Sequence, residues 1–276
     1  MKKLLTVLLC LLNFIYFTGC STATNDFIPT PNFVGLTLEE AQEEAEKKGL
    51  QVKIINDVYD GSFNDGVVIE QSVHSDVIIA KNGTIKLFVN NNYYSMFNMV
   101  NVNDDYSTRY YGAIINGGTP SDIDKYLHLN TFVINSINSN KISETMLFIP
   151  KTYRGKPISG LGANLLQNTN LRMLIIPENI SFVDSNLCGY DGVNYGCTSL
   201  KTIVCLGKNP FYLMSLALSQ EQLDGGCKIY VPDDCVDIYK NYNIGVIPLK
   251  SYSNLIYSIN ELDYETKEEI DSFYNK

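Results

Sequence analysis

Cysteine, histidine and carboxylate side chains are the residues of this 276-residue chain that could do chemistry. The two histidines, His74 and His128, lie far apart in the sequence, which disfavours a shared catalytic pair. The 30 acidic residues are scattered, and no two of them have the spacing of a general acid and base at one site. No Gly-x-Ser-x-Gly elbow or His-Glu-x-x-His helix occurs. Because a reaction needs a defined site, we predict a non-catalytic protein without catalytic, cofactor-binding or metal-binding residues.

Five of the seven cysteines fall within one stretch of the chain. They are Cys188, Cys197, Cys205, Cys227 and Cys235. Their number is odd, which disfavours an obligatory disulfide framework, and no two have the short paired spacing of a zinc site. We predict that most are small buried apolar residues, and one or two disulfides remain the alternative.

Cys20 follows a short basic and then apolar N-terminus. Lys2 and Lys3 precede the apolar run of residues 4–17, and the small residue Gly19 stands directly before the cysteine. This order resembles the signal of a bacterial lipoprotein. The resemblance implies cleavage of residues 1–19, attachment of a lipid to the Cys20 thiol, and anchoring at the extracytoplasmic face of the cell membrane. An ordinary secretory signal and an uncleaved anchor are the alternatives, and residues 20–28 read as a polar tether.

The net charge of the chain is −9, and cleavage of a signal that carries Lys2 and Lys3 makes it more negative. Nucleic acid is disfavoured as a partner, because binding it requires a surface rich in Lys and Arg. The length that remains after cleavage fits two domains, each large enough for its own core.

Residues 29–90 carry the pattern of a small α/β module. Thr37 and Glu40 have the spacing of a capping box, and Gly49 ends the predicted helix in the left-handed conformation. Apolar residues of that helix share one stripe at Leu38, Ala41 and Ala45. Three apolar segments then predict strands near residues 50–54, 67–69 and 85–89.

The order of motifs in this segment resembles a PASTA domain. The resemblance is carried by Pro31, Val34, Gly35, Leu36, Leu38, Ala41, Gly49, Leu50, Val52, Gly66, Val68, Ile69, Gln71, Ser72, Lys81, Gly83, Thr84, Ile85, Leu87 and Val89. It implies one helix on a three-stranded sheet, and a role in sensing peptidoglycan fragments or β-lactams or in spacing other modules. The chain departs from the family pattern at Val73, where a proline is usual, and in His74-Ser75-Asp76, where a glycine is usual.

Residues 91–130 read as a linker or partly ordered connector, and repeated apolar segments begin after them. Residues 158–177 are echoed by residues 180–204, and each copy combines a short strand with a turn. The pattern predicts that Leu165, Leu171 and Leu174 point inward. The repeats resemble the BspA-like leucine-rich repeat, which implies a short β-rich solenoid over residues 131–250. We therefore predict an α+β multidomain chain. Residues 251–276 form an acidic tail, for which a docking helix and a frayed end are the two alternatives.

Together these features predict a membrane-anchored bacterial surface lipoprotein that binds and does not catalyse. The first module would contact peptidoglycan, and the repeats would contact extracellular or host proteins. One alternative is an adhesion or structural protein in which the first module is a passive stalk. The other is a regulatory partner of a kinase or penicillin-binding protein that bears PASTA domains.

The lipid anchor predicts a defined mass. Protein extracted from membranes should begin at Cys20 and carry acyl chains, and its processing should be sensitive to globomycin. Cys20→Ala should abolish both features, because the thiol is the acceptor. Intact-mass spectrometry of the two proteins measures this directly, and an unmodified or uncleaved wild-type chain contradicts the anchor.

Overall fold

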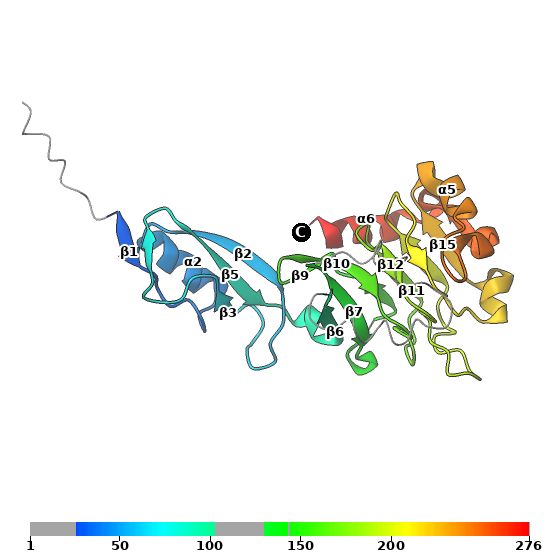
Figure 1. Ribbon diagram of the computed structural model, residues 1–276, viewed down its shortest axis with the longest axis horizontal. Helices are drawn as coiled ribbons and strands as arrows, with labels where there is room; N and C mark the ends of the chain where they lie inside the picture. Colours follow the sequence, from blue (N-terminus) through cyan, green and yellow to red (C-terminus); the bar gives the residue numbers. More distant parts are fainter. Residues whose placement is uncertain (1–25, 103–129, 143, 276) are drawn as a thin grey trace, which may run out of the picture. The chain divides into compact units, whose positions relative to one another are not determined.

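The computed structural model describes residues 26–102, 130–142 and 144–275. The signal 1–19, the lipid site Cys20, His128 and most of the connector 91–130 lie outside these residues. The chain divides into two compact units (Figure 1). Of the described residues, the first unit comprises residues 26–55 and Gly66–Val89, and the second comprises Asn56–Asp65 and the described residues from Asn90 onward.

The described residues of the first unit form one helix and two small sheets. Its helix is α2 (Leu38–Lys47), and a three-stranded sheet has the order β2-β5-β3. A separate antiparallel pair joins β1 to β4. The strands are β1 (Phe27–Pro29), β2 (Gln51–Val58), β3 (Val68–Gln71), β4 (Ile78–Ala80) and β5 (Thr84–Asn90). The predicted helix and three-stranded sheet are confirmed, whereas the β1–β4 pair was not predicted because each of its strands has only three residues.

Local signals set both ends of α2. The Thr37 side chain accepts a hydrogen bond from the Glu40 amide, and the Glu40 carboxylate accepts one from the Thr37 amide at 2.8 Å. This capping box satisfies amides that the first turn leaves without partners. Gly49 has φ +66°, as expected of the residue after a helix. Ala41 and Ala45 are fully buried, so the predicted apolar stripe does face the core of this unit.

The second unit is built from two parallel sheets between which the chain alternates. One has the order β14-β12-β10-β7-β6, in which the edge strand β6 is antiparallel to β7 and the other neighbours are parallel. The other has the order β16-β15-β13-β11-β8. The first sheet contains β6 (Phe97–Asn101), β7 (Phe132–Ile137), β10 (Lys156–Leu161), β12 (Phe182–Val183) and β14 (Tyr212–Leu213), and β9 (Thr152–Tyr153) pairs with β10. The second contains β8 (Met146–Phe148), β11 (Met173–Ile176), β13 (Thr202–Cys205), β15 (Lys228–Val231) and β16 (Ile256–Ser258).

Short helices connect or follow the strands in the described part of this unit. The α-helices there are α5 (Val236–Asn241) and α6 (Tyr264–Tyr274), and α6 follows the last strand. The remaining helical turns are η1 (Asn92–Met96), η4 (Ser139–Lys141), η5 (Gln222–Gly226), η6 (Asp233–Cys235), η7 (Leu249–Leu255) and η8 (Ile259–Glu261). No helix in the described ranges has both the length and the apolar character needed to cross a membrane.

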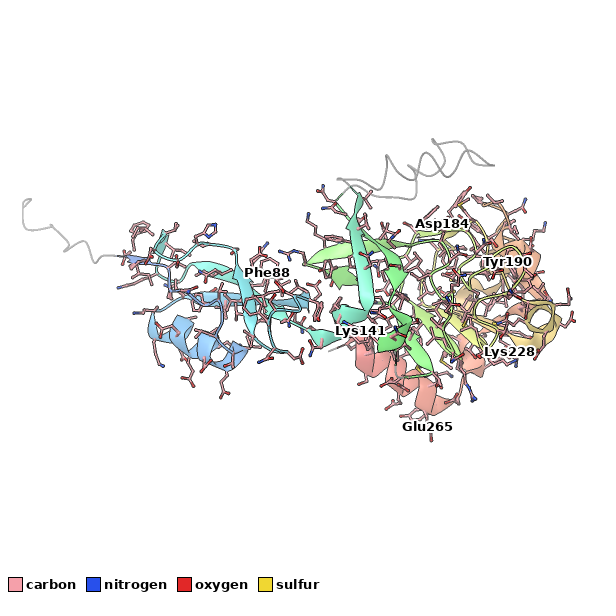
Figure 2. The ribbon with its side chains drawn as sticks, turned by 90° about the horizontal axis from the view of Figure 1, so that it is seen from below. Phe88, Lys141, Asp184, Tyr190, Lys228 and Glu265 are labelled. Carbon is pink, nitrogen blue, oxygen red and sulfur yellow. The ribbon has the colours of Figure 1, made fainter. Side chains whose placement is uncertain are left out.

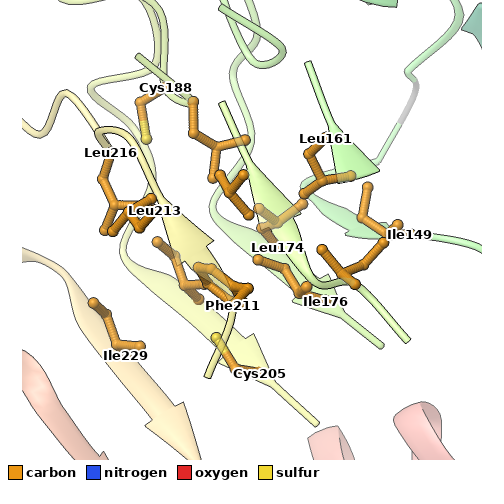
Figure 3. Close-up of a cluster of buried hydrophobic side chains, with 14 of the residues drawn as sticks. Ile149, Leu161, Leu174, Ile176, Cys188, Cys205, Phe211, Leu213, Leu216 and Ile229 are labelled. Atoms are coloured by element: carbon orange, nitrogen blue, oxygen red, sulfur yellow. The ribbon is translucent and has the colours of Figure 1, made fainter. Parts of the chain in front are cut away.

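The main core of the second unit lies between its two sheets (Figure 3). Leu161 from one sheet and Leu174 and Ile176 from the other are buried in the same apolar cluster. Leu171 and Leu165 also belong to it, as the repeat pattern predicts. Burial of such side chains stabilises the unit by about 1.5–3 kcal/mol each, before the entropic cost of ordering the chain is subtracted.

Helix α6 covers the outer face of the second sheet. Ile175 and Val204, which alternate with the inward residues, belong to a second cluster together with Ile270 of α6. Phe273 stacks on Phe148 with ring centroids 4.4 Å apart. The C-terminal tail therefore forms a docked helix, which is the first of its two predicted alternatives.

The described residues do not form the regular solenoid that we predicted, and the assignment to BspA-like repeats is not confirmed. Gly160, Phe182 and Tyr212 are aligned in register, yet different numbers of residues separate them. The difference arises because residues 189–195 form an extra hairpin between β12 and β14. The β6 edge strand and α6 also cover parts of the unit that successive identical coils would leave open.

All five cysteines from Cys188 to Cys235 are buried and unpaired. Burial raises the pKa of each thiol, to about 12 for Cys205 and for Cys227. The prediction of small buried apolar residues fits this arrangement, and none of the described cysteines forms a disulfide.

These thiols should be unreactive until the chain unfolds. Changing Cys10 and Cys20 to alanine leaves these five cysteines as the remaining thiols. At pH 8 a thiol reagent should then modify each of them more slowly in the native chain than in guanidinium chloride. The raised pKa of each thiol leaves less thiolate, which is the nucleophile. For Cys205 and Cys227, a pKa of about 12 leaves roughly a thousandfold less thiolate than an ordinary cysteine has. Raising the pH toward 12 should therefore accelerate the reaction. Rapid modification of a native thiol at pH 8, or a disulfide detected by mass, contradicts this prediction.

Candidate functional site

An open groove lies on the first unit, between α2 and the segment that precedes it. Its volume is about 850 Å³. Its polar and charged lining residues lie along α2 and in a turn that contains Ser75 and Asp76, here called the facing turn. The lining residues are Pro29, Thr30, Pro31, Asn32, Leu36, Glu40, Glu43, Glu44, Lys47, Lys48, Ser75 and Asp76.

One side chain, Gln71, holds the wall of the groove in place. Its carbonyl oxygen accepts a hydrogen bond from the Phe33 amide at 2.7 Å. Its amide nitrogen donates to the carbonyl oxygens of Pro31 at 3.0 Å and Val73 at 2.6 Å. A single glutamine at the end of β3 therefore joins two loops that would otherwise leave backbone groups without partners.

The facing turn is attached to the same segment. The Thr30 amide and hydroxyl both donate to the Val77 carbonyl, at 2.9 and 2.6 Å. The Asp76 amide donates to the Thr30 carbonyl at 2.9 Å. Asp76 has φ +67°, so the left-handed position that a glycine usually takes is occupied by aspartate, one of the few other residues that tolerate it. The departures from the family pattern at Val73 and at residues 74–76 thus leave this turn intact.

Charges of both signs line the groove. Lys47 pairs with Glu43 at 3.4 Å and Lys48 pairs with Glu44 at 3.8 Å, both one helical turn apart. These pairs are exposed, and such pairs contribute only about 0.3–0.5 kcal/mol each, so a ligand can exchange for either partner. The hydrogen bonds that Glu40 accepts from Thr37 lower the pKa of its carboxyl group, which keeps this side chain negatively charged at neutral pH.

This arrangement is suited to reversible binding. Amino groups of a ligand can contact the glutamates, its carboxylates can contact the lysines, and its hydroxyl groups can contact either. His74, the one histidine of the described ranges, does not line the groove. Within those ranges no three His, Cys, Asp or Glu side chains gather closely enough to hold a metal ion.

The sequence pattern assigned the apolar stripe of α2 to the core and did not identify Glu43, Glu44 and Lys47 as part of a groove. The missing information was the position of residues 29–32 and 75–76, which the β1–β4 pairing and the Thr30–Val77 contact provide. Gln71 was noticed as part of the family motif, and its threefold contact explains that motif physically.

Residues 28–91 of this chain match the PASTA domain family. The match covers the first unit with its helix, its three-stranded sheet and the groove, and it also spans residues 56–65, which group with the second unit. Searches of curated proteins and of solved structures found no match.

Removing the Gln71 side chain should destabilise the first unit. Gln71→Ala leaves three backbone groups without their partners, and we expect a loss of about 1–3 kcal/mol. For a unit of this size that lowers the unfolding midpoint by at least about 4 °C. Calorimetry of the full chain measures the transition of the unit.

Gln51→Ala is the matched control, because Gln51 is exposed and its side chain accepts only one long hydrogen bond, from the Thr84 hydroxyl at 3.4 Å. Equal midpoints for the two variants would show that Gln71 does not hold the groove.

Proposed function

We propose that this chain is a non-catalytic, lipid-anchored bacterial surface protein whose PASTA module contacts peptidoglycan. The observation that carries the proposal is the groove of charged residues within the segment that matches the PASTA family. PASTA domains are associated with peptidoglycan binding, with β-lactam binding and with regulatory roles. Cys20 would provide the anchor, and the residues between it and β1 would tether the module to the membrane.

The chemistry of peptidoglycan matches the lining of the groove. Peptidoglycan joins sugars to short peptides that carry free carboxylate and amino groups. Lys47 and Lys48 can receive the carboxylates, while Glu43 and Glu44 can receive the amino groups. The groove is also lined by the apolar side chains of Pro29, Pro31 and Leu36. The carbon skeleton of a ligand can pack against them.

A non-catalytic role is supported by the composition of the groove. Its hydroxyl groups belong to Thr30 and Ser75, and no histidine lines it to act as a general base. The Thr30 hydroxyl already donates to the Val77 carbonyl at 2.6 Å.

We propose that the second unit presents a surface to extracellular or host protein partners and is related to the BspA-like repeats. The alternation of the chain between two parallel sheets supports this relation, as does the echo between residues 158–177 and residues 180–204. The same arrangement supports the alternative of an adhesion protein with a passive PASTA stalk.

Charge reversal in the groove tests the contact with peptidoglycan. The full chain carrying Lys47→Glu and Lys48→Glu should be retained on purified peptidoglycan about tenfold less well, since two favourable contacts are replaced by repulsion. A co-sedimentation assay over a range of protein concentrations gives the apparent Kd.

The control carries Lys53→Glu and Lys86→Glu, which make the same change in net charge on exposed strand positions outside the groove. Retention that falls equally in both variants would indicate non-specific charge attraction. Retention that neither variant changes would favour the passive stalk and contradict the proposal.

A further inference from the structure

A second hollow lies on the second unit, beside the hairpin of residues 189–195. Its volume is about 360 Å³, within the range of pockets that hold small ligands. It is lined by Asn186, Tyr190, Tyr195, Ser215, Ala217, Leu218, Leu223, Ile247, Ser251 and Tyr252. None of these ten side chains carries a charge.

The hairpin that carries Tyr190 and Tyr195 is held rigidly by its own contacts. These two residues pair across it, and the Asp191 carboxylate accepts hydrogen bonds from the amides of Val193 at 2.9 Å and Asn194 at 2.7 Å. Those bonds also lower the pKa of the Asp191 carboxyl group. A loop fixed in this way loses little conformational entropy when a ligand binds.

The base of the hairpin is equally constrained. The Gly196 amide donates to the Gly189 carbonyl at 2.8 Å, and the Tyr190 amide donates to the Asn164 side chain at 3.1 Å. A Cβ atom at Gly189 would lie 2.7 Å from the Cα atom of Gln167, so only glycine permits this close approach.

Two tyrosine rings stand at the mouth of the pocket. Their centroids are 5.2 Å apart with an interplanar angle of 40°, and 37% of Tyr190 and 42% of Tyr195 is exposed. Tyr190 is labelled on the second unit in Figure 2. The apolar neighbours Val193 and Ile247 are also exposed. Ring faces of this kind, exposed beside a hollow, mark a binding surface.

Polar groups also line the same pocket. The Ser215 hydroxyl donates to the Asn186 side-chain oxygen at 3.4 Å, and the Asn186 NH₂ group donates no hydrogen bond within the described part of the chain. The buried Tyr252 hydroxyl accepts from the Leu216 amide at 3.3 Å. Ser251 adds another hydroxyl. The pocket thus combines aromatic faces with neutral donors and acceptors.

We propose that this pocket binds a neutral oligosaccharide. A pyranose ring has an apolar face of C–H groups, which packs against the electron-rich face of an aromatic ring, and an edge of hydroxyl groups, which need neutral hydrogen-bonding partners. The rings of Tyr190 and Tyr195 provide the aromatic faces. Asn186, Ser215 and Ser251 provide the neutral hydrogen-bonding partners. The absence of charge in the lining argues against ionic ligands, and its hydroxyl and amide groups argue against a purely apolar one.

This site is independent of the peptidoglycan contact proposed above, because the two sites lie on different units of the chain. It adds a sugar-binding role to a unit for which we otherwise propose protein partners.

Calorimetric titration of the full chain tests the proposal. The probes are chitotetraose and maltotetraose, which are neutral, and tetragalacturonic acid, which is acidic. At least one neutral probe should bind with a Kd of about 1 mM or tighter, and the acidic probe should bind at least about tenfold more weakly. A preference for chitotetraose would identify N-acetylated sugars, and a preference for maltotetraose would identify plain hexoses.

Tyr195→Ala should weaken the binding of the neutral probe about tenfold or more. The Tyr195 side chain makes no hydrogen bond in the described part of the chain, so this variant should fold normally, which circular dichroism checks. Tyr190→Phe keeps the ring and should retain binding. Tyr264→Ala is the control, because Tyr264 is 73% exposed on α6 and does not line the pocket.

Three results would overturn the proposal. They are no binding of either neutral probe at about 10 mM, binding that Tyr195→Ala leaves unchanged, and tighter binding of the acidic probe. Charge reversal at Lys47 and Lys48 should not affect this titration, so failure here is distinguishable from failure of the peptidoglycan contact.

Discussion

Short strands with apolar side chains on both faces are the constraint on which the second unit depends. No strand of two to six residues is stable alone, and each must pair with neighbours while both of its faces are covered. In β11 the inward residues Leu174 and Ile176 meet the opposite sheet, and Ile175 between them meets α6. The alternating side chains of a strand therefore require two layers of cover, which the first sheet and the C-terminal helix provide.

The first unit has a small apolar core, and hydrogen bonds made by polar side chains hold the loops around that core. Phe33 and Leu87 are fully buried in that core, yet the loops around it depend on hydrogen bonds made by Gln71 and Thr30. Because an unpartnered backbone group costs about 1–3 kcal/mol, these contacts determine where residues 29–32 and 75–76 lie. The groove exists as a consequence of that placement.

The two units present surfaces of opposite chemistry. The groove of the first unit is lined by lysines and glutamates and is suited to a ligand with charged groups, as in the peptide part of peptidoglycan. The pocket of the second unit is uncharged and is bordered by Tyr190 and Tyr195, which suits a sugar ring. The two proposed sites therefore suit different parts of a ligand, the charged groups of a peptide and the uncharged rings of a glycan.

The sequence by itself determined the features that depend on neighbouring residues. Thr37 and Glu40 specify the start of α2, and Gly49 specifies its end. The alternation of side chains around Leu174 specifies the inward face of β11. Capping and side-chain alternation are both local effects. The tertiary structure alone decided the β1–β4 pair, the two packed sheets in place of a regular solenoid, and the docking of α6. Both candidate sites belong to this second group, since each gathers residues more than 30 positions apart, and no local pattern encodes a contact over that separation.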